Sequence, residues 1–372
     1  MKNKFKNKFF STVLVILIIS CLLVSFSSCG QSGNPTPDPG NVDTASNETT
    51  SEIKRGNLNL LTGTYDLADS AVGKRPVSVM INNIKVALPQ YGIGEADVIY
   101  EALAEGGITR LMAVFSDYTK MPKTGPVRSA RDYYLDFAQP LDAMFVHWGT
   151  SNIAASEIKS RGVDNIDGMY WSSYYNTDKA LAAQKGVEHS RFISGDGLVK
   201  IIDKKNERVD NKVKTAAFNF VLPEEEVIPS GQKCDYISAK FSSSYDATFE
   251  YNSENKIYML SEFGKPHMDA GINKQLSFTN VIIIYAPVSL INDGSGKIDV
   301  DLKGGSGIYA SKGGAENITW TKGDTSYDKQ FIFKNTSGEN LKFNTGKTYI
   351  CVVPTTQQNS TVVRSNETSQ VQ

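Results

Sequence analysis

The first thirty residues constrain this chain most, because they decide which part of it is left to fold and on which side of a membrane. Four lysines within the first eight residues precede an apolar run over residues 9–24, and Ser27 and Ser28 precede Cys29. This order is typical of a secretory signal peptide. A cysteine directly after the small residues predicts a lipoprotein signal over residues 1–28, with a diacylglyceryl group on Cys29 as the mature N-terminus.

Two alternatives to this lipoprotein signal are an uncut anchor with one transmembrane helix and an ordinary cleaved signal. The apolar run is interrupted by Ser20 and Cys21, and it is short for a span of about 20 residues. Stable anchoring needs two lipid chains, which a diacylated cysteine supplies. We therefore expect a protein acylated with chains such as palmitate and held on the extracytoplasmic face of the cell membrane.

The charge balance limits the partners of the mature chain. The full sequence has 39 basic and 40 acidic residues, and the predicted signal removes four lysines and no acid, which leaves a net charge of about −5. An acidic exported domain is unsuited to nucleic acid. The partners that we expect are the membrane, through the lipid, and a cell-envelope polymer or envelope protein.

The folded part keeps two cysteines, Cys234 and Cys351. Outside the cytoplasm such a pair can oxidise. Cys351 lies in an apolar, strand-like run, so we favour two separate buried thiols. Sequence spacing alone leaves the disulfide open.

A change in hydrophobic periodicity near residue 212 divides the chain. Before it, strand and helix patterns alternate, and after it a period of two dominates. We predict an α+β or α/β fold, an N-terminal α/β domain followed by a mainly antiparallel β domain. The predicted segments are a flexible linker over 29–57, the α/β domain over 58–212, the β-rich domain over 213–356 and a disordered tail over 357–372.

The N-terminal half predicts strands at 77–81, 98–103, 108–115 and 144–146, with Gly106 and Gly107 as the turn of a hairpin. Ser129 with Asp132 has the form of a capping box, and predicts a helix that stops before Pro140. Ser151 and Ser194 predict two further helix starts.

The C-terminal half predicts strands at 218–221, 247–251, 256–260, 281–285, 298–302, 330–334 and 347–353. Gly304 to Gly307 is interpreted as a turn.

Polar residues at the ends of the predicted strands form one candidate ligand-binding or catalytic site. Glu101 and Glu105 are four residues apart, which puts both carboxylates on one face of a helix or of a strand. Arg128 and Arg131 stand at a predicted helix start, where free N–H groups and arginines favour an anion. A salt-bridge network with the two glutamates is the alternative. The candidate residues are Asn82, Asn83, Glu101, Glu105, Arg110, Arg128, Ser129, Arg131 and His147.

His147 at a strand end is a candidate general base or a hydrogen-bonded structural residue. Three histidines without close spacing are weak support for a metal site, so we predict no metal and no cofactor. No nucleophile-elbow or complete P-loop pattern is present.

Four motifs carry a resemblance to a known family: Asp97-Val-Ile-Tyr-Glu101, Glu105-Gly-Gly-Ile-Thr-Arg110, Gly125-Pro-Val-Arg-Ser-Ala-Arg131 and His147. They resemble the YerB-like family of bacterial lipoproteins, and the resemblance covers roughly residues 74–355. The motifs in the N-terminal half are the most specific. The C-terminal half resembles the family's second domain through residues 313–320 and 346–354. At Glu188-His-Ser-Arg191 the chain departs from the Pro-His-Asn pattern of the relatives. The family is a domain of unknown function, so the resemblance implies a two-domain layout and a lipid anchor, and supplies no reaction.

Three functions follow as hypotheses, with an enzyme the less favoured class. The preferred one is a membrane-anchored lipoprotein that binds an anionic envelope ligand or a protein partner. The alternative is an envelope hydrolase that uses Glu101 with Glu105, or Glu105 with His147, as acid and base. The third is a scaffold that regulates another envelope enzyme.

Overall fold

A mixed sheet of 11 strands runs through the computed structural model, which describes residues 55–322 and 329–366. The predicted signal peptide, Cys29 and the linker up to residue 54 lie outside the described residues. The strands of this central sheet are β1 (Val77–Asn82), β2 (Val98–Leu103), β3 (Thr109–Phe115), β4 (Met144–His147), β5 (Asn165–Asp167), β8 (Gln232–Lys233), β16 (Asn280–Ala286), β19 (Gly304–Ser311), β20 (Gly314–Thr321), β21 (Ile332–Asn335) and β22 (Thr348–Pro354).

The central sheet joins the two halves of the sequence. Its order is β21-β20-β19-β16-β22-β2-β3-β1-β4-β5, with β8 paired to β20. Strand β22 lies between β2 and β16 and is parallel to both. β1 and β4, and β4 and β5, are also parallel, and the remaining pairs are antiparallel. The sheet therefore crosses the predicted boundary at residue 212, with β2 and β22 as the neighbours at the junction.

A second, antiparallel sheet has the order β12-β11-β10-β9-β23, with β15 paired to β11. Three two-stranded ribbons complete the described strands: β6 (Asn176–Thr177) with β7 (Arg191–Phe192), β13 (Met268–Asp269) with β14 (Lys274–Gln275), and β17 (Val288–Leu290) with β18 (Ile298–Val300). The second sheet consists of β9 (Tyr236–Ser242), β10 (Tyr245–Asn252), β11 (Ile257–Glu262), β12 (Lys265–Pro266), β15 (Ser277–Phe278) and β23 (Val362–Arg364).

The helices are short and connect the strands. The α-helices are α1 (Leu135–Ala138), α2 (Asn152–Ser160), α3 (Lys179–Lys185) and α4 (Gly195–Lys205). Single 3₁₀ turns occur at Asp69–Ala71, Lys85–Ala87, Ile93–Glu95, Glu105–Gly107, Tyr118–Lys120, Asp132–Tyr134, Gln139–Leu141, Ser172–Tyr174, Val187–His189 and Thr355–Ser360.

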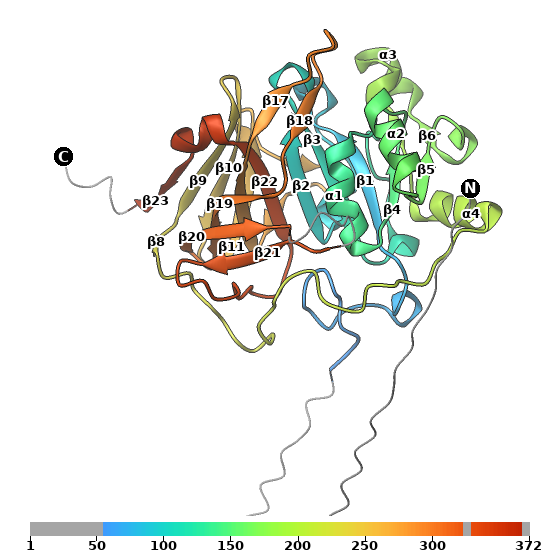
Figure 1. The fold of residues 1–372 in the computed structure, drawn as a ribbon. Coiled ribbons are helices and arrows are strands. Elements are labelled where there is room, and N and C mark those ends of the chain that lie inside the picture. The colour runs from blue at the N-terminus through green and yellow to red at the C-terminus, as the bar shows by residue number, and fades with distance from the viewer. Residues whose placement is uncertain (1–54, 323–328, 367–372) are drawn as a thin grey trace, which may run out of the picture. The chain divides into compact units, whose positions relative to one another are not determined.

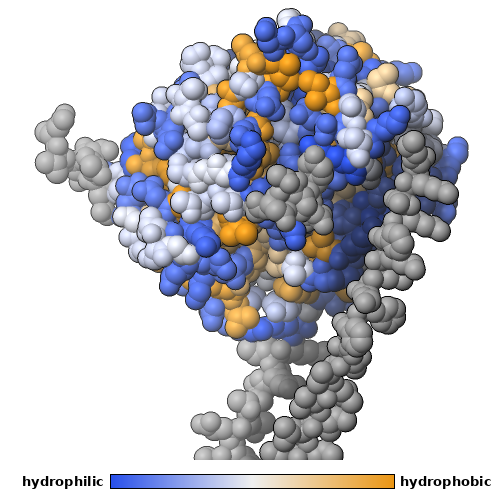
Figure 2. All heavy atoms as spheres, in the orientation of Figure 1, coloured by the Kyte–Doolittle hydropathy of each residue, from blue (hydrophilic) through white to orange (hydrophobic). Residues whose placement is uncertain are grey.

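Both faces of the central sheet are covered, because successive side chains of a strand point to opposite sides. On one face, residues such as Ile99 and Leu111 pack against the second sheet and α4. On the other face, Tyr100 and Met112 pack against α1 and a group of aromatic rings. Figure 1 shows α1 and α2 in front of the central sheet, and β9, β10 and β11 of the second sheet in the left-hand region of the view, where β19, β20 and β21 of the central sheet also lie. In Figure 2 this side of the molecule is mostly hydrophilic, with apolar side chains in small separate patches.

The predicted fold class is confirmed, and most of the predicted elements are found. Gly106 and Gly107 form the β2–β3 turn with φ values of 71° and 73°, a backbone that glycine adopts without strain. Ser151 and Ser194 cap α2 and α4 by accepting hydrogen bonds from Ala154 N and Gly197 N.

Three local predictions are wrong. Residues 304–307 begin β19, where a side chain on Gly305 or Gly307 would collide with the carbonyl oxygens of Tyr285 and Ile283 on β16. Residues 218–221 form only an isolated bridge to Phe343 instead of a strand. The disordered tail predicted from residue 357 is instead ordered over its described part: it continues the Thr355–Ser360 turn and then pairs as β23 with β9. Backbone hydrogen bonds to β9 satisfy the polar groups of this segment.

The two cysteines of the folded part, Cys234 and Cys351, are both buried and free. Burial raises the pKa of Cys234 to about 11 and that of Cys351 well above its ordinary value, so both thiols are protonated. Among the described residues, no helix is long and apolar enough to cross a bilayer.

Candidate functional site

The predicted site residues do not meet at one place, because the central sheet separates them. Glu101 is paired in register with Leu111, and the next pair is Ala102 with Arg110. Side chains of paired residues share a face, and neighbouring pairs face opposite ways. Glu101 therefore points toward the second sheet, and Arg110 points toward the opposite side.

The first group is a buried polar cluster between the two sheets, which we call the interlayer cluster. Its centre is the carboxyl group of Glu101 on β2. Oε1 accepts hydrogen bonds from Thr109 Oγ1 and Tyr245 Oη, both at 2.6 Å, and Oε2 accepts one from Tyr349 Oη at 2.8 Å. The Nδ2 of Asn83 lies 3.1 Å from the same Oε1. Donors from four segments thus converge on one carboxyl group, and two of them, Tyr245 and Tyr349, come from the other half of the chain.

A second carboxyl group, that of Glu262 on β11, extends the interlayer cluster. Its Oε1 accepts a hydrogen bond from Asn83 Nδ2 at 3.2 Å. Its Oε2 lies 3.2 Å from His267 Nδ1. On the other side of the imidazole, His267 Nε2 donates to Gln90 Oε1 at 2.5 Å, and Gln90 Nε2 donates to Asn83 Oδ1 at 2.8 Å. These hydrogen bonds link β11, Gln90 and the segment after β1, while the buried Glu262 Oε2 and His267 Nδ1 face each other without a hydrogen bond.

The protonation of Glu101 follows from this environment. Burial, and then the nearby Glu262, raise the pKa of Glu101 to about 8, although the hydroxyl donors oppose the shift. The side chain is fully buried. Glu101 therefore carries a proton at neutral pH and serves the packing of the two sheets, out of reach of a substrate in solvent.

Glu105 lies in a different layer from Glu101 and belongs to an ion-pair network. Its two carboxylate oxygens accept hydrogen bonds from Arg131 Nε at 2.5 Å and Nη2 at 2.8 Å, a bidentate geometry. Burial alone would raise the pKa of Glu105, but the hydrogen bond and charge of Arg131 bring it below its ordinary value. The expectation that Glu101 and Glu105 share a face is therefore wrong, because Glu105 lies in the turn after β2.

Glu105 lies beside a group of four arginines, Arg110, Arg128, Arg131 and Arg191, which we call the arginine cluster. Arg110 Nη2 lies 3.6 Å from Glu105 Oε2, and Arg110 Nη1 donates to Ser129 O at 2.6 Å. Burial, and then the charge of Arg131, lower the pKa of Arg110 to about 10, so it remains a cation at neutral pH.

The other two arginines are held without an ion pair. Arg191 stacks over the ring of Trp148, with Cζ 4.2 Å from the ring centroid, a cation–π contact. Arg128 is half-buried, and burial lowers its pKa although the charge of Glu188 opposes the shift. Within residues 55–322 and 329–366, neither Arg128 nor Arg191 forms an ion pair with a carboxylate. The exposed Glu188 is the further acid that interacts electrostatically with both.

The arginines do not stand at a helix start as predicted. Arg128 N donates to Met80 O at 2.8 Å, and Ala130 N donates to Gly149 O at 3.0 Å, so this segment is extended and bridges β1 to the loop after β4. The helical turn begins only at Asp132, and Ser129 is not its cap. The backbone N–H groups of Arg128 and Ala130 therefore donate to carbonyl oxygens of the protein, and the positive charge of this segment comes from its side chains.

His147 and Asn82 are satisfied within the protein. His147 Nδ1 donates to Gly149 O at 2.9 Å, and Nε2 accepts from Asn165 Nδ2 at 2.9 Å. Burial lowers the pKa of His147 despite the charge of Asp167, so the imidazole is neutral and fully enclosed. Asn82 contacts His189 Nδ1 at 2.8 Å. The described residues contain no cluster of acidic, histidine or cysteine side chains able to hold a metal.

Sequence reasoning missed the partners that complete both groups. Glu262, Tyr245 and Tyr349 lie more than 140 positions from Glu101. Arg191 lies on β7 and reaches the cluster through hydrogen bonding of its carbonyl to Val127 N at 2.8 Å. Only the departure from the family pattern at residues 188–191 drew attention to that loop.

Comparisons with known proteins agree with this architecture. Residues 61–208 match the family model "Protein of unknown function (DUF3048) N-terminal domain", and residues 237–350 match its C-terminal domain. A curated relative from Bacillus subtilis (strain 168), named "Putative lipoprotein YerB", is 30% identical over 285 residues, which is 76% of this chain and 82% of the relative. The crystal structure of YerB from Bacillus subtilis superposes with a TM-score of 0.72 at 26% identity, and covers 83% of this chain and 99% of that chain.

Proposed function

We propose that this chain, which belongs to the DUF3048 family of proteins of unknown function, functions in the cell envelope. The protein is a lipoprotein that is anchored through Cys29 to the extracytoplasmic face of the cell membrane. Its arginine cluster binds an anionic component of the envelope that bears phosphate or carboxylate groups.

The observation that supports an anionic ligand is that Arg128 and Arg191 form no ion pair with a carboxylate of the described residues. Four guanidinium groups stand against two carboxylates, those of Glu105 and the exposed Glu188. Arginine forks bind phosphate and carboxylate groups in a bidentate manner. A half-buried guanidinium that forms no ion pair is stabilised by an anion from outside, since burial without a hydrogen-bonded partner costs free energy.

The anchor is supported by the signal pattern before Cys29 and by the relative's printed name as a lipoprotein. The hydrolase alternative has no comparable support, because the central sheet keeps Glu101 and Glu105 in separate layers.

Ligand binding is tested by calorimetry with polyphosphate and with polygalacturonate, which separate phosphate from carboxylate recognition. We expect Arg128→Gln and Arg191→Gln each to weaken binding by about tenfold. Arg364→Gln is the matched control, since Arg364 also stacks on a ring, 4.4 Å from the centroid of Tyr236, but lies on β23. Equal affinity in all four proteins, wild type included, would exclude the arginine cluster as the site.

The anchor is tested by feeding labelled palmitate to cells that express the full chain. We expect Cys29→Ser to abolish label incorporation and to release the protein from the membrane fraction. Cys21→Ser is the control, because Cys21 lies within the predicted signal and its loss should leave labelling unchanged. Label that survives in Cys29→Ser would refute acylation at this residue.

A further inference from the structure

A cavity of about 510 Å³ lies between residues 56–76 and residues 211–217, away from both the interlayer cluster and the arginine cluster. In Figure 1 these are the blue segment and the yellow-green segment that run along the lower edge of the central sheet. Ligand sites typically have volumes of about 300–1,000 Å³ and mostly apolar walls. The size of this cavity is within that range.

Backbone hydrogen bonds join the two wall segments of the cavity at both ends and fix their relative position. Ala217 N donates to Leu60 O at 2.7 Å at one end, and Asn211 N donates to Gly73 O at 2.8 Å at the other. Asn59 attaches the segment of residues 56–76 to the residue before β2, because its Nδ2 donates to Asp97 Oδ1 at 3.0 Å. The space between the segments therefore exists before any ligand binds, so binding requires little ordering of the protein.

The lining is mostly apolar and includes two cationic side chains. Its main side chains are Leu58, Leu61, Leu67, Val72, Leu141 and Val213. Two lysines, Lys74 and Lys214, also line it, and no aspartate or glutamate does. Lys74 is paired with Asp210 at 2.8 Å, whereas Lys214 has no ion pair within the described part of the chain.

We infer that this cavity binds the hydrocarbon chain of an anionic single-chain amphiphile, with the acidic head group beside Lys214. The apolar walls remove the chain from water, and each buried methylene contributes about 0.8 kcal/mol. The lysine supplies a point charge for a carboxylate or a phosphate. A fatty acid and a lysophospholipid share this chemistry.

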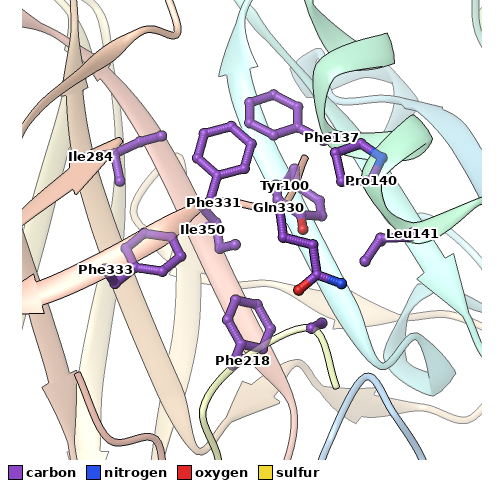
Figure 3. Close-up of a pocket in the computed structure, with 11 residues that line it drawn as sticks. Tyr100, Phe137, Pro140, Leu141, Phe218, Ile284, Gln330, Phe331, Phe333 and Ile350 are labelled. Carbon is purple, nitrogen blue, oxygen red and sulfur yellow. The ribbon is translucent and has the colours of Figure 1, made fainter. Parts of the chain in front are cut away.

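The inner end of the cavity gives the chain a direction. Leu141 and Ala217 line both this cavity and a narrower gap of about 20 Å³ among aromatic rings. Figure 3 shows this gap, with the rings of Phe137, Phe331 and Tyr100 side by side and Leu141 at its margin. The rings of Phe137 and Phe331 stack at 5.4 Å between centroids, so the gap is closed to a ligand. The chain end stops at this aromatic wall, and the head group stays at the open side.

Access to lipid follows from the anchor, and this step rests on the proposed function. Residues 29–54 number 26, and a chain of that length reaches at most about 90 Å. Gly56 and Asn57, which directly follow that linker, are part of the cavity wall. The cavity is thus held within reach of the membrane surface from which such an amphiphile comes.

Binding is tested by calorimetry with palmitate and with palmitoyl-lysophosphatidylglycerol, below their micelle concentrations. The protein is the unit of residues 54–372, which contains both hydrophobic layers. We expect Val72→Asp to weaken binding by about tenfold or more. Leu290→Asp is the matched control, because Val72 and Leu290 are both exposed apolar residues, at 50% and 73%, and Leu290 lies in the β17–β18 ribbon. Thermal melts must show that both variants fold.

The contribution of charge is read from Lys214→Gln, which should weaken palmitate binding several-fold and leave hexadecanol binding unchanged. Palmitate binding alone identifies a fatty acid as the ligand, and lysolipid binding identifies a membrane lipid. Binding that is absent in the wild type, or unchanged in Val72→Asp, overturns the inference. Loss of binding in the longer chain from residue 29 also overturns it, because the chain itself is then the occupant. None of these outcomes depends on acylation of Cys29 or on the arginine cluster.

Discussion

Glu101 on β2 and Glu262 on β11 belong to different sheets, yet both accept a hydrogen bond from the same Nδ2 of Asn83, at 3.1 and 3.2 Å. The two carboxyl groups are thereby held close together in the interior. Two negative charges in such a place repel each other and lose their hydration. We therefore expect the contact between the sheets to be sensitive to the protonation of Glu101.

Glu101→Gln tests this sensitivity through the pH dependence of the free energy of unfolding. The pKa of Glu101 is about 8 in the folded state, above the 4.5 of an unperturbed glutamate. The folded state keeps a proton that the unfolded state loses, so wild-type stability should fall as the pH rises from about 4.5 to about 8. Glutamine resembles the protonated acid, and this decline should be smaller in the variant. Urea unfolding at a series of pH values measures it.

The control for Glu101→Gln is Glu105→Gln, because the pKa of Glu105 is lowered in the folded state by Arg131. Its stabilisation is present above the unfolded pKa and is lost as the pH falls through the folded pKa. If the unfolding free energy of Glu101→Gln depends on pH as that of the wild type does, Glu101 is ionised in the folded state.

Tyr349→Phe removes one hydroxyl donor from the interlayer cluster and leaves Glu101 Oε2 without that partner. A buried polar group left unsatisfied costs about 1–3 kcal/mol, and we expect a loss of unfolding free energy in this range. Tyr236→Phe is the control, since the ring of Tyr236 is stacked under Arg364 and its variant should stay within about 0.5 kcal/mol of wild type. Equal losses in the two variants would argue against the hydrogen bond as the cause.

His147 should remain a neutral imidazole with its proton on Nδ1. The carbonyl oxygen of Gly149 accepts at Nδ1, and the amide of Asn165 donates to Nε2. Because burial lowers the pKa of His147, the unfolded state takes up a proton first as the pH falls below about 6.5, and the stability from this group is lost over that window. Nitrogen NMR of the imidazoles reads both the tautomer and the titration. A His147 that titrates at its ordinary pKa would contradict this assignment.

Ser151→Ala and Ser129→Ala should differ although both serines fit a capping pattern. Ser151 Oγ accepts a hydrogen bond from Ala154 N at 3.1 Å at the start of α2, and its loss should cost about 1 kcal/mol. Ser129 caps no helix, so its variant should stay within about 0.5 kcal/mol of wild type. Thermal or urea unfolding compares them. A larger loss in Ser129→Ala would mean that its hydroxyl has a role beyond capping.

The sequence predicts where the strands and turns of this fold lie better than it predicts which strands pair with each other. A run such as Val77 to Ile81 shows by its composition that it is a buried strand, and the pair Gly106-Gly107 shows where a hairpin turns. Neither pattern says that β2 will lie beside β22, because pairing between distant strands leaves no local signal.

The candidate site was only partly predictable for the same reason. The arginines and Glu105 do meet, since they come from segments next to β1 and β3. Glu101 was assigned to the wrong neighbours, because its partners Tyr245, Glu262 and Tyr349 come from the other half of the chain. Ser129 matched a capping pattern, but β1 binds that segment in an extended form.

The position of β22 has a consequence for the order in which the protein is completed. Strand β2 is an edge strand until residues 348–354 have been made and have paired with it. Contacts between such distant residues form slowly, because a long loop must close first. Until β22 has paired with it, β2 presents a row of unpaired backbone N–H and C=O groups, at which a strand of another chain could add.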